Sequence, residues 1–140
     1  MLKLKAPLFH SIRSHGEASF PNECCGVLLG SVKGEERVVS SLFPIENQFE
    51  TSERFHRFLI TPEDYRKAEN AARKEKLDVI GFYHSHPDSP SIASKYDLDH
   101  AFPWFSYLIV SIMNRAYGDH HSWIMENDRS KFIEETVVIE

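Results

Sequence analysis

The feature that most constrains this chain is an apolar segment that runs directly into a pair of histidines. Asp78–Tyr83 (DVIGFY) has the short, apolar character of a buried strand, and it continues into His84-Ser85-His86-Pro87. Because proline has no backbone N–H, we expect regular strand pairing to end in this second segment. Side chains two positions apart on an extended chain point to the same face, so His84 and His86 can direct both imidazoles at one point. The sequence therefore predicts a buried strand whose carboxyl end carries a metal-binding pair.

Other segments of the chain predict further strands and helices. Cys25–Val32 and Arg37–Pro44 are apolar and β-branched, and the Gly-containing segment between them predicts a hairpin. Thr61 followed by Pro62 and two acidic residues predicts the start of a helix that reaches Lys76. We also expect a helix over residues 7–18, a surface loop over 46–57, a short strand over 58–60, a helix over 94–102, and strands over 107–113, 121–126 and 132–139. This series predicts an α+β fold around a mixed sheet.

Length, charge and cysteine content limit the organisation and partners of the chain. Its 140 residues, 41% of them hydrophobic, suit one core, so we expect a single domain over residues 1–140. A net charge of -5 leaves no basic patch for nucleic acid. The longest apolar stretch, Tyr107–Met113, is too short to span a membrane, and residues 1–20 lack the apolar core of a secretory leader. Adjacent Cys24 and Cys25 do not suit a disulfide framework. These features predict a cytoplasmic protein.

Asp97 completes a candidate metal site with the two histidines. It lies in the predicted helix that follows the Pro- and Ser-rich stretch 87–91, and so its carboxylate can return to the end of the strand. Two imidazoles and one carboxylate make three ligands, the number that leaves a tetrahedral zinc ion one open position for water. The sequence therefore predicts one Zn²⁺ per chain, bound by His84, His86 and Asp97, at a catalytic rather than a structural site.

The complete motif resembles that of a known family. His84-x-His86-Pro87, followed after six residues by Ser94-x-x-Asp97, is similar to the motif of the JAMM or MPN+ zinc metalloproteases. Standalone bacterial members of this family also resemble the chain at Pro21–Gly30 (PNECCGVLLG), around Glu46-Asn47 and at Arg57–Pro62, so the resemblance covers about residues 6–126. It implies helices layered on a mixed sheet, as in cytidine deaminases.

The resemblance also implies roles for individual residues. Glu23 would be the base and acid that moves a proton, and Ser94 would donate its hydroxyl to the oxyanion. His84, His86 and Asp97 would hold the zinc. The implied reaction is hydrolysis of a peptide or isopeptide bond at the carboxyl terminus of a ubiquitin-like protein. For the standalone bacterial type, the implied substrate is a sulfur carrier with a terminal diglycine.

Alternatives remain open for the function and for single residues. The same family includes desampylase-like isopeptidases, cell-wall or phage-tail peptidases, and non-catalytic MPN scaffolds for protein interaction. Ser94-x-x-Asp97 is also a capping-box pattern, which is compatible with a role in the site. His100 lies one helical turn after Asp97 and could orient it, whereas Cys24 and Cys25 are expected to be buried. The cluster Phe102, Trp104, Phe105 and Tyr107 is typical of a core.

Overall fold

The computed structural model describes residues 1–47 and 60–140. The predictions for residues 48–59, which include most of the expected loop and the start of the expected strand at 58–60, lie outside the described residues. Within the described part, the chain forms eight strands in one mixed sheet, in the order β7-β6-β5-β4-β2-β3-β1-β8. The strands are β1 (Leu2–Leu4), β2 (Cys25–Lys33), β3 (Glu36–Ile45), β4 (Asp78–Pro87), β5 (Ser106–Met113), β6 (Ala116–Met125), β7 (Phe132–Glu135) and β8 (Val137–Ile139).

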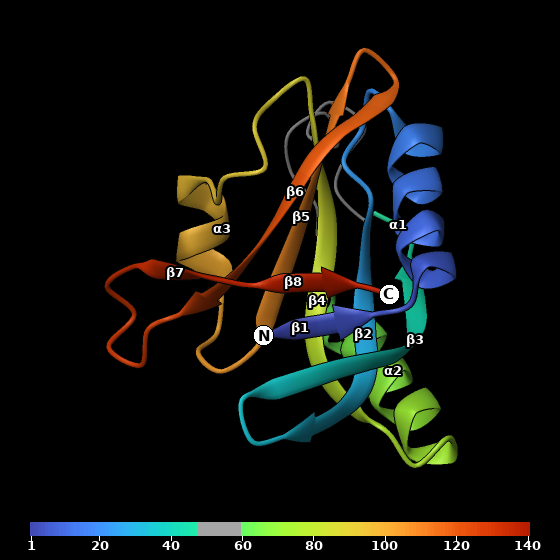
Figure 1. Cartoon of the computed structure of the whole chain (residues 1–140), viewed down its shortest axis with the longest axis vertical. Coiled ribbons are helices and arrows are strands. Elements are labelled where there is room, and N and C mark those ends of the chain that lie inside the picture. The colour runs from blue at the N-terminus through green and yellow to red at the C-terminus, as the bar shows by residue number, and fades with distance from the viewer. Residues whose placement is uncertain (48–59) are drawn as a thin grey trace.

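The sheet combines antiparallel hairpins with parallel pairs. The strands β2 and β3 form a hairpin, as do β5 and β6. The strands β4 and β5 are parallel, and helix α3 (Lys95–His100) lies in the crossover between them. The strand β1 runs parallel to both β3 and β8, so the two ends of the chain meet at one edge of the sheet (Figure 1). The metal-site candidates lie in and after β4, which is a central strand of this sheet.

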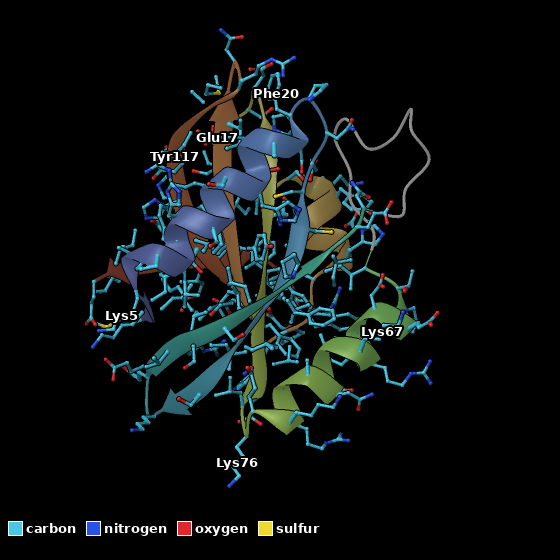
Figure 2. The ribbon with its side chains drawn as sticks, turned by 90° about the vertical axis from the view of Figure 1, so that its right-hand side faces the viewer. Lys5, Glu17, Phe20, Lys67, Lys76 and Tyr117 are labelled. Carbon is cyan, nitrogen blue, oxygen red and sulfur yellow. The ribbon has the colours of Figure 1, made fainter. Side chains whose placement is uncertain are left out.

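Helices cover both faces of the sheet. Helix α1 (Ala6–Ser19) lies across one face, in front of the strands in Figure 2. Helix α2 (Pro62–Lys74) and helix α3 belong to the other face, where α2 buries Ala68 and Ala72 against the sheet. This arrangement confirms the predicted α+β fold with a mixed sheet flanked by helices. The boundaries of the domain, residues 1–140, remain a prediction.

Each face has its own apolar core. The α1 face buries Phe9 and Ile12 against Leu28, Leu108 and Ile112. The opposite face packs Val27, Phe82 and Tyr107 against α2 and the end of α3. Full burial of one such side chain contributes about 1.5–3 kcal/mol, so the two layers supply the main stabilisation of the sheet. Among the described residues, no helix is both long and apolar enough to cross a membrane.

The structure changes several of the predicted boundaries. Strand β4 does end at Pro87, as predicted, and its pairing with the parallel neighbour β5 runs up to Pro87 and Ile112, whereas other boundaries differ. The predicted helix over 94–102 begins at Lys95 and ends at His100. The strand expected at 121–126 begins at Ala116, and the one expected at 132–139 is two strands, β7 and β8. Strand β1 was not predicted, because its three residues gain partners only from β3 and β8, which are distant in sequence.

Close contact between β2 and β4 depends on a glycine. A Cβ atom at Gly26 would lie 2.2 Å from the ring of Tyr83, which is itself buried on the α1 face. The hydroxyl of Tyr83 lies 2.8 Å from Nδ1 of His15 in α1, so the ring is held from both sides. Only a residue without a side chain therefore fits at position 26.

Candidate metal centre

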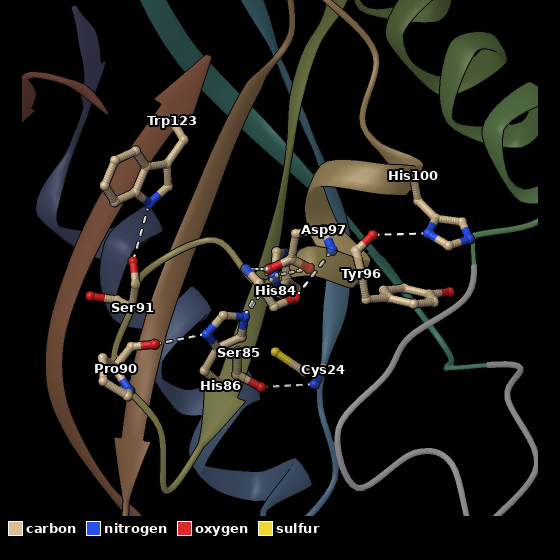
Figure 3. Close-up of polar contacts among 11 residues, drawn as sticks. Cys24, His84, Ser85, His86, Pro90, Ser91, Tyr96, Asp97, His100 and Trp123 are labelled. Carbon is tan, nitrogen blue, oxygen red and sulfur yellow. Dashed lines mark hydrogen bonds and ion pairs between the residues drawn. The ribbon is translucent and has the colours of Figure 1, made fainter. Parts of the chain in front are cut away.

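Three predicted ligands converge at the carboxyl end of β4. The Nε2 atoms of His84 and His86 lie 3.2 Å apart. Oδ1 of Asp97 is 3.2 Å from Nε2 of His84, and Oδ2 of Asp97 is 3.1 Å from Nε2 of His86 (Figure 3). All three side chains are buried. The structure therefore brings the three ligating groups to one point.

Side chains along β4 alternate between the two faces of the sheet, so the candidate ligands lie on one face and Ser85, which holds the neighbouring segment, lies on the other. His84 and His86 face the α2 and α3 side, whereas Ser85 lies against Gly16 of α1. The backbone N–H of Ser85 donates to the carbonyl of Cys24 at 3.2 Å, and the N–H of Cys24 donates to Oγ of Ser85 at 2.8 Å. This pair of bonds ties the segment before β2 to β4. It thereby holds Glu23 next to the histidines.

Asp97 is positioned by the first turn of α3. Its backbone N–H donates to Oγ of Ser94 at 3.1 Å, and the N–H of Ser94 donates to Oδ2 of Asp97 at 2.8 Å. These reciprocal bonds form the predicted capping box, in which Ser94 is the N-cap. The same carboxylate that caps the helix faces the histidines. Because Oγ of Ser94 accepts a bond there, its hydrogen is available to another acceptor.

Hydrogen bonding and charge prepare the ligands for a cation. Nδ1 of His86 lies 2.8 Å from the carbonyl of Pro90, which can only accept, so Nδ1 carries the proton and Nε2 is left as the ligating atom. Burial lowers the pKa of His84, which favours its neutral form. Burial also opposes the charge of Asp97, but the neighbouring histidines hold the pKa of this carboxyl well below its usual range. Burial lowers the pKa of His86, but its contact with the charged Asp97 raises it overall, so Nε2 of His86 must release its proton before it binds a cation. With that proton gone, two neutral imidazoles and one carboxylate form a suitable donor set for zinc.

The spacing of the donor atoms also fits zinc. Donors with bonds of about 2.0 Å to a tetrahedral ion lie about 3.3 Å from one another. The two Nε2 atoms lie 3.2 Å apart, and each lies 3.1 to 3.2 Å from one of the two oxygens of Asp97, Oδ1 for His84 and Oδ2 for His86. The spacing of the three side chains is therefore compatible with a bound zinc ion.

Glu23 lies beside these ligands in a dry environment. Its carboxylate and the ring nitrogens of His84 and His86 include ligating atoms that all lie within 4.8 Å of one another. Glu23 is only 5% exposed. Burial raises the pKa of Glu23 to about 8; the charge of His86 opposes this shift, and that of Asp97 adds to it. A carboxyl group with such a pKa can both accept and release a proton near neutral pH.

Two cavities border the site. The larger, of about 780 Å³, lies between α2 and α3 and has aromatic walls that include Tyr65, Phe105 and Tyr107. It reaches the ligands His84 and Asp97. The smaller, of about 240 Å³, is lined by residues that include the polar groups of the site, namely Glu23, His86 and Ser94. The candidate ligands therefore lie between a larger, mainly apolar cavity and a smaller one that is lined in part by Glu23 and Ser94.

Other residues considered from the sequence take ordinary positions. Nδ1 of His100 lies 2.8 Å from the carbonyl of Tyr96, and its ring stacks on that of Tyr96, so these contacts do not make it an orienting partner of Asp97. Cys24 and Cys25 are buried free thiols, as expected, and burial raises the pKa of both. Of the predicted aromatic core, Phe102 is 63% exposed and Trp104 46%, so this part of the prediction was wrong.

A group of polar side chains beside the site was not predicted. Ser91, Asp119, His121 and Trp123 are joined by hydrogen bonds next to the loop that follows β4. They come from one loop and one strand, at spacings that match no motif. No signal in the sequence distinguishes this group.

Comparison with known proteins agrees with this fold and site. The model of the family described as prokaryotic homologs of the JAB domain matches residues 5–126. The chain belongs to this family. It is 31% identical over 118 residues to a desampylase of Pyrococcus furiosus, an alignment that covers 84% of this chain and 76% of the relative. It is 33% identical over 127 residues to a desampylase of Haloferax volcanii, with 87% of each chain covered.

Solved structures give the same result for the fold. The solution structure of protein DSY2949 from Desulfitobacterium hafniense superposes with a TM-score of 0.87 at 28% identity, covering 100% of this chain and 93% of that one. A JAB1/MPN domain protein from Archaeoglobus fulgidus superposes with a TM-score of 0.61 at 18% identity, covering 100% of this chain and 97% of that one. The sequence relatives and the fold together support a hydrolase of the JAMM type.

Proposed function

We propose that this protein is a zinc-dependent peptidase or isopeptidase that hydrolyses an amide bond at the carboxyl terminus of a ubiquitin-like protein of the sulfur-carrier type, in the cytoplasm. The observation that carries the proposal is the convergence of His84, His86 and Asp97 within 3.1 to 3.2 Å, with Glu23 beside them. A non-catalytic MPN scaffold would not need three buried ligating groups and a fourth, proton-accepting group.

Each residue of the proposed site has a task in the hydrolysis. His84, His86 and Asp97 would hold Zn²⁺, which acts as a Lewis acid and lowers the pKa of a bound water to about 7. Glu23 takes a proton from the attacking water and passes it to the nitrogen of the leaving amine. Burial raises the pKa of Glu23 to about 8 in the metal-free protein, and a bound cation would lower this pKa, which leaves a carboxylate able to take up the proton. The hydroxyl of Ser94 donates to the oxygen that becomes negative in the tetrahedral intermediate.

The proposed substrate class rests on the relatives and on the shape of the site. Two desampylases are the sequence relatives described above, and the motif resembles that of enzymes that cut ubiquitin-like proteins. The ligating groups lie between two cavities, so an extended tail can reach them from the larger one. A terminal diglycine would bring its amide bond up to the proposed ligands without side chains of its own, since glycine has none. A desampylase-like isopeptidase, or a peptidase of the cell wall or phage tail, keeps the same chemistry with another substrate.

The test is cleavage of a ubiquitin-like sulfur carrier that bears extra residues after its terminal diglycine, followed by mass spectrometry. The wild-type protein loaded with zinc should release the extension. Glu23→Gln should bind zinc as the wild type does but lose at least about a thousandfold in turnover, because proton transfer is lost. Glu69→Gln, a change at an exposed glutamate of α2, is the matched control and should cut normally.

Three outcomes would contradict parts of the proposal. Wild-type protein that binds no zinc would contradict the proposed metal site. Full turnover by Glu23→Gln would show that Glu23 is not the proton carrier. Zinc-loaded enzyme that leaves every such carrier intact would contradict the proposed substrate class but not the proposed metal site.

A further inference from the structure

The ring of His86 is oriented by a backbone carbonyl of the loop that follows β4. Nδ1 of His86 donates to the carbonyl of Pro90 at 2.8 Å, and this bond directs Nε2 toward His84 and Asp97 (Figure 3). A carbonyl in a loop orients a ring only if the loop itself is held. Pro90 is exposed, so its neighbours must hold it.

The residue after Pro90 is held by side chains of β6. Ser91 is fully buried, with 0% exposure. Its carbonyl accepts from Nε1 of Trp123 at 3.1 Å. Its Oγ lies 2.8 Å from Oδ1 of Asp119 and 2.6 Å from Nδ1 of His121. Three side chains of β6 thus form hydrogen bonds with both the carbonyl and the hydroxyl of Ser91.

The hydrogen bonds of this group have one consistent direction. The hydroxyl of Ser91 has a single hydrogen, which goes to the carboxylate of Asp119 because a carboxylate only accepts. His121 must therefore donate from Nδ1 to Oγ of Ser91. Nε2 of His121 then faces Glu134, 3.8 Å away. This network of hydrogen bonds leaves the side chain of Ser91 little freedom to rotate.

The start of the same loop is also held. The N–H of Asp88 donates to the carbonyl of Ile112 at 2.8 Å, and Oγ of Ser111 donates to the carbonyl of Ser89 at 2.6 Å. The peptide that carries the Pro90 carbonyl therefore lies between bonds to β5 on one side and to β6 on the other.

We propose that Ser91, Asp119, His121 and Trp123 form a clamp that positions the imidazole of His86 through the carbonyl of Pro90. These are positioning residues, since they touch neither the ligand set nor the reacting atoms. The inference rests on the proposed function, in which His86 is a zinc ligand. Partners that orient a ligating histidine in this indirect way typically change metal affinity by about 10- to 100-fold.

The test compares Trp123→Phe, Ser91→Ala and the double variant with wild type in two measurements. The first, on metal-free protein, is the solvent exchange rate of the His86 Nδ1–H proton, followed by NMR. The second is the zinc Kd, measured by competition with a chelator. We expect the double variant to exchange this proton at least about tenfold faster and to bind zinc about 10- to 100-fold more weakly. Each single variant should show a smaller change in the same direction.

Ser106→Ala is the matched control. Ser106 is also fully buried, and its Oγ accepts from Nη1 of Arg37 at 3.2 Å, away from the loop after β4. This control should lose stability without changing the His86 proton or the zinc Kd. If the double variant does not fold, Asp119→Ala takes its place, because Asp119 is exposed.

The outcomes separate the clamp from the proposed function. A folded variant that loses stability but keeps the wild-type exchange rate and zinc Kd would overturn the clamp. Wild-type protein that binds no zinc would overturn the proposed function, while the exchange rate would still report whether the clamp orients His86.

Discussion

Helices α2 and α3 begin with the same hydrogen-bond pattern, yet only one of them contributes to the candidate site. In α2, the N–H of Asp64 donates to Oγ1 of Thr61 at 3.1 Å, and the N–H of Thr61 donates to Oδ2 of Asp64 at 3.3 Å. In α3, Ser94 and Asp97 exchange the equivalent bonds at 3.1 and 2.8 Å. The two caps are almost the same in geometry.

The difference lies in what the capping carboxylate faces. Asp64 is partly buried at the start of a 13-residue helix. Asp97 is buried in a 6-residue helix, and both of its oxygens contact histidines of β4. A helix as short as α3 has little stability of its own, so its cap serves mainly to hold the carboxylate in place. A common structural motif thus gains a chemical role from the strand that it packs against.

The largest expected difference between the two caps is in metal binding. Asp97→Asn changes one of the three proposed ligands, and we expect it to weaken zinc binding by more than about a hundredfold, a larger loss than that caused by losing an orienting partner. Asp64→Asn, the same change in the other cap, should leave the zinc Kd unchanged. Chelator competition on both purified variants measures this. Equal affinities would mean that Asp97 is only a capping residue.

The next difference is in catalytic rate. Thr61→Ala and Ser94→Ala should each cost about 1 kcal/mol of stability through the lost cap. Only Ser94→Ala should also lower turnover, by about 100- to 1,000-fold, because it removes a donor to the developing oxyanion. Ser94→Gly separates the two effects, since glycine at an N-cap costs only a few tenths of a kcal/mol. Normal turnover by Ser94→Gly would assign the serine to capping alone.

The smallest expected difference is in stability, and it depends on pH. Because the pKa of Glu23 is raised from 4.5 to about 8, the folded protein binds the proton more tightly than the unfolded chain. The stability that this proton contributes is complete below pH 4.5 and is lost as the pH rises through about 8. Metal-free Glu23→Gln should therefore be more stable than wild type at pH 9, by a few kcal/mol at most, and the advantage should vanish near pH 4.5.

Urea unfolding of metal-free protein at several pH values measures this stability change. Glu69→Gln, in the exposed part of α2, should show no such pH-dependent gain. An advantage of Glu23→Gln that is the same at pH 5 and pH 9 would contradict a buried, proton-binding Glu23.

The elements that could be predicted are those determined by local sequence. The hairpin of β2 and β3 follows from two β-branched runs around Gly34, and α2 follows from Thr61-Pro62. Strand alternation was enough to place His84 and His86 on one face. The early start of β6 was not predictable in this way, because its hairpin turn places Asn114 and Arg115 at positive φ without the glycine that usually marks such a turn.

The parts of the site that could not be predicted depend on pairing between distant segments. Glu23 reaches the histidines because Cys25 pairs with His84 across β2 and β4. Nothing local distinguishes Glu23 from other glutamates, and it was selected only through the family resemblance. The clamp around Ser91 was missed for the same reason, since its members meet only after β6 has paired with β5.

The contact between Gly26 and Tyr83 links the interior of the sheet to the chemistry at its end. One added methyl group at position 26 would lie 2.2 Å from the ring of Tyr83, so either the ring or strand β2 would have to shift. A shift of β2 at Gly26, beside the paired Cys25 and His84, would move Glu23 relative to His86. It would separate the proposed proton carrier from the proposed ligand while leaving every site residue in the sequence. Inspection of the motif alone would therefore classify such a homologue as intact, although its glutamate would no longer lie beside the candidate metal ligands.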